Sequence, residues 1–226
     1  MRLVGAVNVY QDAAFLSECL AALRPQVDRL IVVDGAYRDF PIYEEKDKPK
    51  TAASTDGTLF AARAVADLVI EAPGGEPWSD EIAKRNAYLQ AGEPGDYLFV
   101  VDADEILEGL IDRAALDSRD DWLIELYLVR PHIDASHGEP PPRDGNPYGI
   151  HRAFRWRPGI RYAGTHHAVH VGDALIHPDS LLRDRLPGVR LRHLSARRDP
   201  ERRARKHAYY DRLAPAERAF RAAHSL

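Results

Sequence analysis

Four short apolar segments in the first half of the chain alternate with segments of helical character, and this alternation narrows the possible folds more than any other feature. The apolar segments are residues 3–9, 29–33, 68–71 and 97–101. Short apolar segments of this kind fit buried strands. Strands that alternate with helices usually pair in parallel, so we expect an α/β fold with a mainly parallel central sheet flanked by helices.

The helices between these strands have recognisable ends. Asp12 can cap a helix that stops near Pro25, because an aspartate carboxylate accepts a hydrogen bond from the first helical turn. Residues 58–67 are rich in alanine and predict a second helix. Ser79 can cap a third helix over residues 78–91.

The second half of the chain follows a different pattern. It predicts strands at residues 122–129, 152–156, 168–171 and 188–194, and a basic helix at residues 200–213. No internal repeat and no clear linker interrupts the sequence. We therefore expect one domain spanning residues 1–226, with residues 1–121 as one half and residues 122–226, including a small mixed region, as the other.

Length and composition indicate an ordinary globular protein. The chain has 226 residues, of which 45% are hydrophobic, enough for a packed core. Cys19 is the only cysteine, which excludes a disulfide framework and a cysteine-based zinc site. No apolar run is long enough to span a bilayer, and the N-terminus lacks the features of a signal peptide, so we expect a cytoplasmic protein.

Charge is unevenly distributed between the two halves. Residues 1–121 contain 24 acidic and 12 basic side chains, whereas residues 122–226 contain 11 acidic and 19 basic ones. The basic excess indicates either an anionic partner or mutual neutralisation of the halves. The most basic stretch, residues 196–213, fits a solvated helix face or a surface that grips an anionic acceptor, such as a nucleic acid or an anionic lipid.

Polar residues follow three of the predicted strands in the first half. Asn8, Asp34 and Asp102 stand at or near the ends of apolar segments. The carboxyl ends of parallel strands share one edge of a sheet, and ligands of open α/β sheets bind outside that edge. The sequence therefore predicts a binding site there, of the kind that holds a nucleotide.

Asp102 and Asp104 form a D-x-D pair at the end of GDYLFVVDADEIL, residues 95–107. In an extended backbone, residues two apart point the same way, so both carboxylates can face one Mg²⁺ or Mn²⁺ ion. A solvated turn or a helix N-cap is the structural alternative. Repulsion within such a cluster predicts that Asp104→Asn leaves the stability of the metal-free protein unchanged or higher.

Several segments, in order along the chain, resemble the family 2 glycosyltransferases of the GT-A fold. The segments are RLVGAVNVYQDAAFLSECLAAL, DRLIVVDGA, STDGT and KRNAYLQAGEPGDYLFVVDADE. STDGT departs from the family pattern, because about 20 residues separate it from VVDG. The resemblance implies a GT-A-like fold and a metal-dependent transferase that moves a sugar from a nucleotide-sugar donor, with a UDP-sugar favoured, to an acceptor hydroxyl.

The resemblance also assigns donor-binding residues. Asn8 and Tyr10 occupy positions that line the nucleobase pocket, and Asp34 a position that contacts base or ribose. Arg85 and Asn86 match positions near the nucleotide and the donor sugar. As alternatives, Asn8 and Asp34 are simple turn formers at strand ends.

Metal ligation is implied for three residues. Asp102 resembles the residue that approaches the ribose and the water shell of the metal, and Asp104 resembles the direct ligand. His193 follows a late strand and can complete the shell of Mn²⁺, with His166 as a competitor. An ordinary histidine at a strand end is the alternative for His193.

The catalytic base is less clearly indicated. RAFRWRPGIRYAGTHHAVH resembles a family segment in which His166 fits the histidine, but His167 stands where an acidic residue is expected. His167 could act as a general base, since the pKa of histidine lies near working pH, or contact a phosphate. Asp134 is a rival base, and the stereochemical outcome stays open.

Two other functions compete with sugar transfer. A nucleotidyltransferase also places carboxylates and a metal on an α/β sheet, but NVYQDAAF has no glycine-rich loop after the first strand. A non-catalytic nucleic-acid-binding protein would use the basic second half and leave the D-x-D pair unexplained. The acceptor is not indicated, although a polyanion such as modified DNA or a cell-envelope glycan is consistent with the basic second half.

Overall fold

The structure is a computed structural model that describes residues 1–38, 51–118, 123–129, 148–164, 168–175, 185–194 and 197–223. The elements of the first half are β1 (Arg2–Val9), α1 (Ala13–Leu23), β2 (Arg29–Asp34), α2 (Thr58–Val65), β3 (Leu68–Ile70), α3 (Glu81–Gln90), β4 (Asp96–Asp102), β5 (Glu105–Glu108) and α4 (Arg113–Asp117). Those of the second half are β6 (Leu123–Val129), β7 (Tyr148–Arg155), β8 (Ile160–Tyr162), β9 (Val169–Val171), β10 (Ala174–Leu175), β11 (Arg185–His193) and α5 (Pro200–Ala223).

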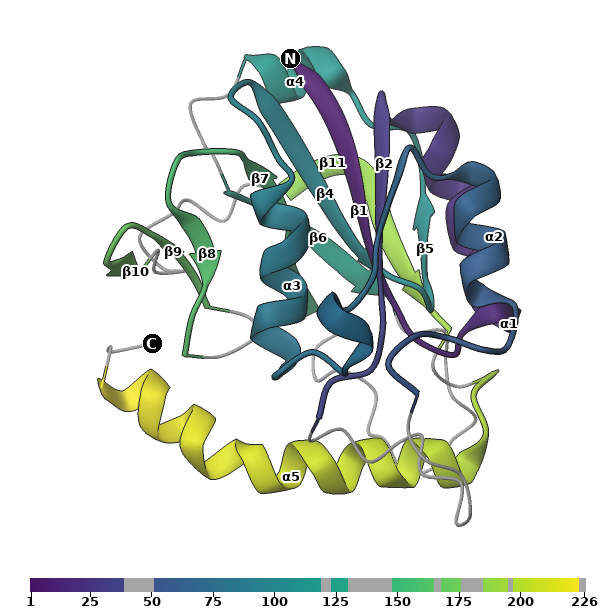
Figure 1. Ribbon diagram of the computed structural model, residues 1–226. Helices are drawn as coiled ribbons and strands as arrows, with labels where there is room; N and C mark the ends of the chain where they lie inside the picture. Colours follow the sequence, from purple (N-terminus) through teal and green to yellow (C-terminus); the bar gives the residue numbers. More distant parts are fainter. Residues whose placement is uncertain are drawn as a thin grey trace.

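An eight-stranded sheet forms the centre of the molecule, in the order β3-β2-β1-β4-β7-β6-β11-β5 (Figure 1). The neighbours β3-β2-β1-β4 are all parallel, as are β6 and β11, whereas β7 and β5 pair antiparallel to their neighbours. A separate antiparallel sheet has the order β10-β9-β8. The predicted α/β fold, with a mainly parallel central sheet flanked by helices, is confirmed.

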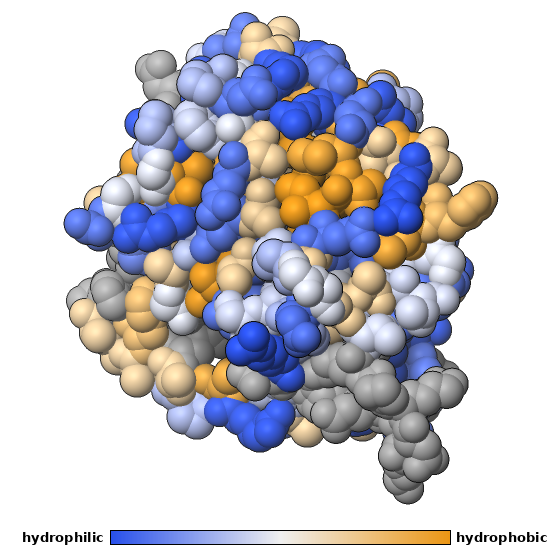
Figure 2. Space-filling view, viewed as in Figure 1, coloured by the Kyte–Doolittle hydropathy of each residue, from blue (hydrophilic) through white to orange (hydrophobic). Residues whose placement is uncertain are grey.

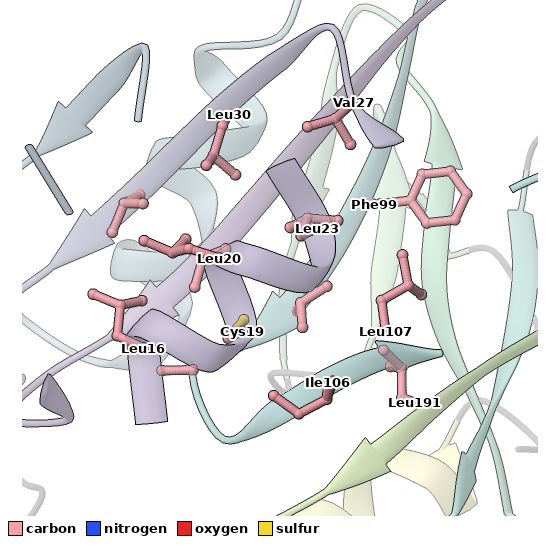
Figure 3. Packing of buried hydrophobic residues seen from close by; sticks show 14 of the residues in the cluster. Leu16, Cys19, Leu20, Leu23, Val27, Leu30, Phe99, Ile106, Leu107 and Leu191 are labelled. Carbon is pink, nitrogen blue, oxygen red and sulfur yellow. The ribbon is translucent and has the colours of Figure 1, made fainter. Parts of the chain in front are cut away.

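The sheet has two apolar faces because successive side chains on a strand point to opposite sides. On β1, Leu3 and Val7 belong to one buried cluster, which includes α1, whereas Val4 and Ala6 belong to the other, which includes α3. Figure 3 shows side chains of α1 packed among those of the strands in the first cluster. Burial on both faces explains why the parallel strands are continuous apolar runs in the sequence.

The registers of the parallel strands bring their carboxyl ends to one edge. Val9 of β1 lies beside Asp34 of β2, and Asn8 lies beside Asp102 of β4. Figure 1 shows α5 running across this edge, at the bottom of the view. A long helix from the second half therefore covers the place where the strands of the first half end.

Three local predictions were wrong. Asp12 stands at the N-cap of α1, but its side chain makes no capping hydrogen bond. The third helix is capped by Asp80 rather than Ser79: the Asp80 carboxylate accepts a hydrogen bond from the backbone N–H of Ala83 at 2.7 Å. The N-cap alternative for the D-x-D segment also fails, because a strand, β5, follows it.

The basic helix is longer than predicted. It continues to Ala223 with Pro215 inside it, whereas the sequence predicted an end at residue 213. A proline removes one backbone hydrogen bond and kinks a helix, but strong helix formers on either side can continue it. Figure 1 shows α5 changing direction toward its C-terminal end.

Gly35 shapes the chain directly after β2. Its φ of +123° lies in a region that side chains rarely adopt, and an added Cβ would lie 2.8 Å from the carbonyl oxygen of Ala52. Only glycine therefore fits the tight exit from the strand, which brings the following residues to the edge where β1 and β4 end.

Candidate functional site

A cleft lies at the shared edge of the parallel strands, between the strand ends and α5. We call it the strand-end cleft; its empty volume, open solvent included, is ≈ 660 Å³. It is lined by Asn8, Val9, Tyr10, Asp12, Gly35, Ala36, Tyr37, Glu81, Lys84, Arg85, Asp102, Ala103, Asp104, Arg198, Arg202, Arg203, Lys206 and Tyr210. Its lining therefore mixes cationic, acidic and aromatic side chains from both halves of the chain.

The cleft brings together five of the residues predicted for the site: Asn8, Tyr10, Arg85, Asp102 and Asp104. Among the described residues, the Oδ1 atom of Asn8 is buried and has no hydrogen-bond partner. A bound ligand could supply that partner. Tyr10 is buried, and its hydroxyl donates to the carbonyl oxygen of Thr51 at 2.7 Å.

Asp102 lies between two arginines. Its carboxylate is 3.1 Å from the Nη2 atom of Arg85 and 2.8 Å from the Nη2 atom of Arg152. Arg152 also reaches Glu105, whose carboxylate accepts a hydrogen bond from the backbone N–H of Asp102 at 2.8 Å. Burial acts to raise the pKa of Asp102, but Arg152 and Arg85 outweigh it and hold that pKa well below its usual value.

Asp104 has a different set of cationic neighbours. Its Oδ2 atom lies 2.9 Å from the Nε atom of Arg198 and 3.6 Å from the Nε2 atom of His193. Burial acts to raise the pKa of Asp104, but Arg198, His193 and Lys206 hold it well below its usual value. Because β4 ends at Asp102, the extended-backbone argument for the D-x-D pair does not extend to Asp104.

Asp12 joins the same network from the start of α1. Its carboxylate forms ion pairs with Arg198 and with Arg202, the latter at 2.8 Å. Arg202 also donates a hydrogen bond to the carbonyl oxygen of Gln11 at 3.0 Å. The segment that leads into α5 and the first turn of α5 are thus bound to the residues between β1 and α1 by ion pairs and a hydrogen bond.

Cationic and aromatic residues of α5 share the face that lines the cleft. Arg202, Arg203, Lys206 and Tyr210 recur at the spacing of three and four residues that places helical side chains on one side. In Figure 2 a group of hydrophilic residues lies near the bottom of the view, with more apolar residues to its left, toward the C-terminal end of α5. The sequence analysis missed this face, although the spacing was available to predict it.

Glu81 and Lys84 of α3 also line the cleft. Glu81 pairs with Arg85 at 2.9 Å and accepts hydrogen bonds from the hydroxyls of Tyr37 and Tyr210, each at 3.4 Å. The ammonium of Lys84 donates to the carbonyl oxygen of Val9 at 2.7 Å. Burial lowers the pKa of Lys84 to about 8, although the nearby Asp34 opposes this shift.

Three predicted site residues lie outside the lining of the cleft. Asp34 is fully buried, and its carboxylate accepts hydrogen bonds from the backbone N–H and the hydroxyl of Ser54, at 2.8 and 2.5 Å. Asn86 exchanges two hydrogen bonds with the backbone of Tyr162, at 3.0 and 2.7 Å, and so holds β8 against α3. His193 is near Asp104 but does not line the cleft.

The predicted base residues cannot be placed. His167, its neighbour His166 and Asp134 all lie outside the described residues. Their roles stay predictions.

The arrangement of the described residues does not fit the predicted metal centre. Within the ranges that the structure describes, no three histidine, cysteine, aspartate or glutamate side chains gather as a metal-binding group. Each carboxylate of the D-x-D pair instead contacts an arginine, at 2.8 Å for Asp102 and 2.9 Å for Asp104. The positive charge at the end of β4 therefore comes from side chains of this chain, and the Mn²⁺ or Mg²⁺ ion stays a prediction.

No family model matches the chain, but part of a longer protein is similar to it. A TPR repeat-containing protein of Synechococcus elongatus is 30% identical over 172 residues, which cover 74% of this chain and 35% of that protein. The chain thus spans about a third of the length of this curated relative.

Two solved structures illustrate the structural similarities. The crystal structure of S. aureus TarS 1-349 in complex with UDP has a TM-score of 0.44 and 22% identity, covering 63% of this chain and 38% of that one. Glucosyl-3-phosphoglycerate synthase from Mycobacterium tuberculosis, in complex with Mn²⁺, UDP and glucosyl-3-phosphoglycerate, has a TM-score of 0.40 and 18% identity. The similar region covers 58% of this chain and 44% of the synthase chain.

None of the described helices combines the length and the apolar character needed to cross a bilayer.

Proposed function

We propose that this protein is a glycosyltransferase of the GT-A type, which moves a sugar from a nucleotide-sugar donor to an acceptor hydroxyl, with a UDP-sugar as the favoured donor. The observation that carries the proposal is the strand-end cleft. It gathers Asn8, Tyr10, Arg85, Asp102 and Asp104, five of the residues that match the motifs of the resembling family. The cleft also lies where open α/β sheets bind ligands.

The lining suits the parts of such a donor. A nucleobase presents N–H donors, and the unpartnered Oδ1 atom of Asn8 could accept a hydrogen bond from one of them. A diphosphate needs cations, and among the described residues Lys84, Arg85, Arg198, Arg202, Arg203 and Lys206 line the cleft. In the transfer, the acceptor oxygen bonds to the anomeric carbon while the bond from that carbon to the diphosphate breaks. The proton of the acceptor passes to a base, for which His167 and Asp134 are our candidates.

Of the two competing functions, nucleic-acid binding receives less support. The nucleic-acid-binding alternative relied on the basic second half, yet four cations of its most basic stretch, Arg198, Arg202, Arg203 and Lys206, line the cleft. A nucleotidyltransferase would use the same cleft for a nucleoside triphosphate. The acceptor stays open, and a polyanion such as modified DNA or a cell-envelope glycan remains our candidate class.

A thermal-shift screen tests the proposal. UDP-, GDP- and TDP-sugars, each with and without Mn²⁺, are compared with nucleoside triphosphates and a DNA oligonucleotide. A ligand that binds only the folded state at 100 times its dissociation constant stabilises it by about 2.7 kcal/mol. We expect a UDP-sugar to raise the melting temperature most.

Product analysis separates the enzyme classes. Release of UDP from a UDP-sugar supports glycosyl transfer, whereas release of pyrophosphate from a nucleoside triphosphate and a sugar phosphate supports nucleotidyl transfer. A shift with the oligonucleotide alone would contradict both.

A further inference from the structure

Lys206 occupies a distinctive position in the strand-end cleft. It is half-buried on the face of α5 that lines the cleft, and it makes no hydrogen bond or ion pair with the described residues. Asp102 and Asp104 line the same cleft. One lysine therefore shares the cleft with both carboxylates of the D-x-D pair and forms an ion pair with neither.

A second cation on the same helix face also lacks a partner. The Nε atom of Arg203 is buried and has no hydrogen-bond partner among the described residues. Burying such a donor unpaired costs free energy, so a ligand that accepts its hydrogen bond would be favoured. Lys206 and Arg203 thus offer unpaired donors to the same cleft.

A metal ion at the D-x-D pair would meet an occupied site. Arg198 is largely buried between Asp104 and Asp12, with a side chain 8% exposed, and Arg152 is buried between Asp102 and Glu105. A divalent cation on Asp104 would have to displace Arg198 or lie beside its guanidinium. The metal ion and the guanidinium are both positively charged, and like charges side by side repel strongly where solvent is scarce.

On the basis of the proposed function, we propose that Lys206, with Arg203, binds the diphosphate of the donor, and that donor binding needs no divalent metal ion. Asp102 and Asp104 then act as positioning residues. They anchor Arg85, Arg152 and Arg198 around the cleft.

The transfer balances without a further co-reactant. As the bond from the anomeric carbon to the diphosphate oxygen breaks, its electron pair remains on that oxygen. The Lys206 ammonium donates a hydrogen bond to the departing diphosphate and offsets its growing charge. The proton of the acceptor hydroxyl passes to the base, so Lys206 keeps its own proton.

Titration calorimetry with UDP tests this inference directly. Binding is measured in EDTA and in MnCl₂ for the unmodified protein, Lys206→Gln and the matched control Arg205→Gln. Arg205 precedes Lys206 on the same helix, carries the same charge and does not line the cleft. Pyrophosphate in EDTA serves as a second probe, since it contains the diphosphate without the nucleoside.

We expect UDP to bind equally well in EDTA and MnCl₂. Lys206→Gln should weaken UDP and pyrophosphate by about 10- to 100-fold, the usual range for a lost charge-assisted hydrogen bond. Arg205→Gln should leave both unchanged. Lys206→Arg should restore most of the affinity, which guards against a variant that merely folds poorly.

Three results would overturn the inference. UDP binding that requires Mn²⁺ would restore the metal centre and leave the proposed function intact. Equal UDP affinities for Lys206→Gln and Arg205→Gln would remove Lys206 from the site. Failure of every nucleotide to bind, with or without Mn²⁺, would instead contradict the proposed function itself and this inference with it.

Discussion

At the scale of single residues, the charge at the end of β4 is balanced by arginines that lie far away in the sequence. Arg152 is 50 positions from Asp102, and Arg198 is 94 positions from Asp104. The sequence predicted that the carboxylates of the D-x-D pair repel each other. That prediction was wrong because each carboxylate contacts a cation. The expected effect of removing one charge changes sign as a result.

Asp104→Asn should therefore destabilise the protein. Breaking a buried ion pair leaves Arg198 with a single charged partner, Asp12, and should cost on the order of 2 kcal/mol. The free energy of unfolding in urea measures this loss. Asp173→Asn is the matched control, because Asp173 is fully exposed and should change stability by less than about 0.5 kcal/mol. Equal stabilities of the two variants would contradict the network.

Lys84 gives a prediction for the pH dependence of stability. Its pKa is lowered to about 8 by burial, below the 10.5 of an ordinary lysine. Between these values the unfolded state holds the proton and the folded state has lost it, so stability should rise with pH.

Lys84→Met should abolish this rise. Between pH 8 and 10 the unmodified protein should gain on the order of 2 kcal/mol relative to the variant. Urea unfolding at several pH values gives the difference between the two proteins and cancels the titration of their shared tyrosines. Parallel curves would show that Lys84 keeps its ordinary pKa when folded.

At the scale of elements, the main strands and helices could be predicted, and the contacts between them could not. The segments at residues 3–9 and 97–101 became β1 and β4 within about one residue, because local periodicity determines such elements. The pairing of α5 with the strand ends depends on side chains from both halves of the chain. No local pattern encodes it, although the spacing of Arg202 and Lys206 was available to predict which face of α5 is cationic.

Aromatic packing also holds α5 in place. Tyr209 is 7% exposed, and its ring lies 6.2 Å from that of Tyr37 and 5.2 Å from that of Tyr210. These contacts lie one helical turn beyond Lys206. The docking of α5, and with it the cationic wall of the cleft, therefore depends on Tyr209 as well as on the ion pairs of Asp12.

Tyr209→Ala should loosen α5 without unfolding the sheet. Loss of a buried aromatic side chain costs roughly 3 kcal/mol. Hydrogen exchange should show faster exchange in α5 and unchanged protection in β1 and β4. Phe60→Ala, which truncates a ring that is 82% exposed, should leave α5 as it was. Uniform loss of protection would mean that α5 belongs to the same cooperative unit as the sheet.

At the scale of the whole molecule, the first half supplies the parallel strands and the second half supplies much of the charge. The acidic first half and the basic second half meet at the strand-end cleft, where Asp102 contacts Arg152 and Asp104 contacts Arg198. Mutual neutralisation of the halves, one of the two explanations for the uneven charge, is thus realised there. The excess cations on α5 are consistent with the second explanation, an anionic ligand.

The site could be predicted only in part. Asn8, Tyr10, Asp102 and Asp104 reached the cleft because they lie at or just after the ends of β1 and β4, whose parallel pairing could be predicted, whereas Arg85 reaches it from α3. Asp34 and Asn86 instead make internal hydrogen bonds, with Ser54 and Tyr162. Such partners depend on loop and sheet geometry, which a single sequence does not encode.

A crystal structure of the protein grown with UDP and MnCl₂ tests the central claim most directly. The account predicts uridine in the strand-end cleft, with the nucleobase hydrogen-bonded to the Oδ1 atom of Asn8 and the diphosphate beside Lys206. Arg198 should stay on Asp104. UDP bound outside this cleft would contradict the proposed function. UDP in the cleft with Mn²⁺ on Asp104 and Arg198 displaced would contradict the metal-free diphosphate site.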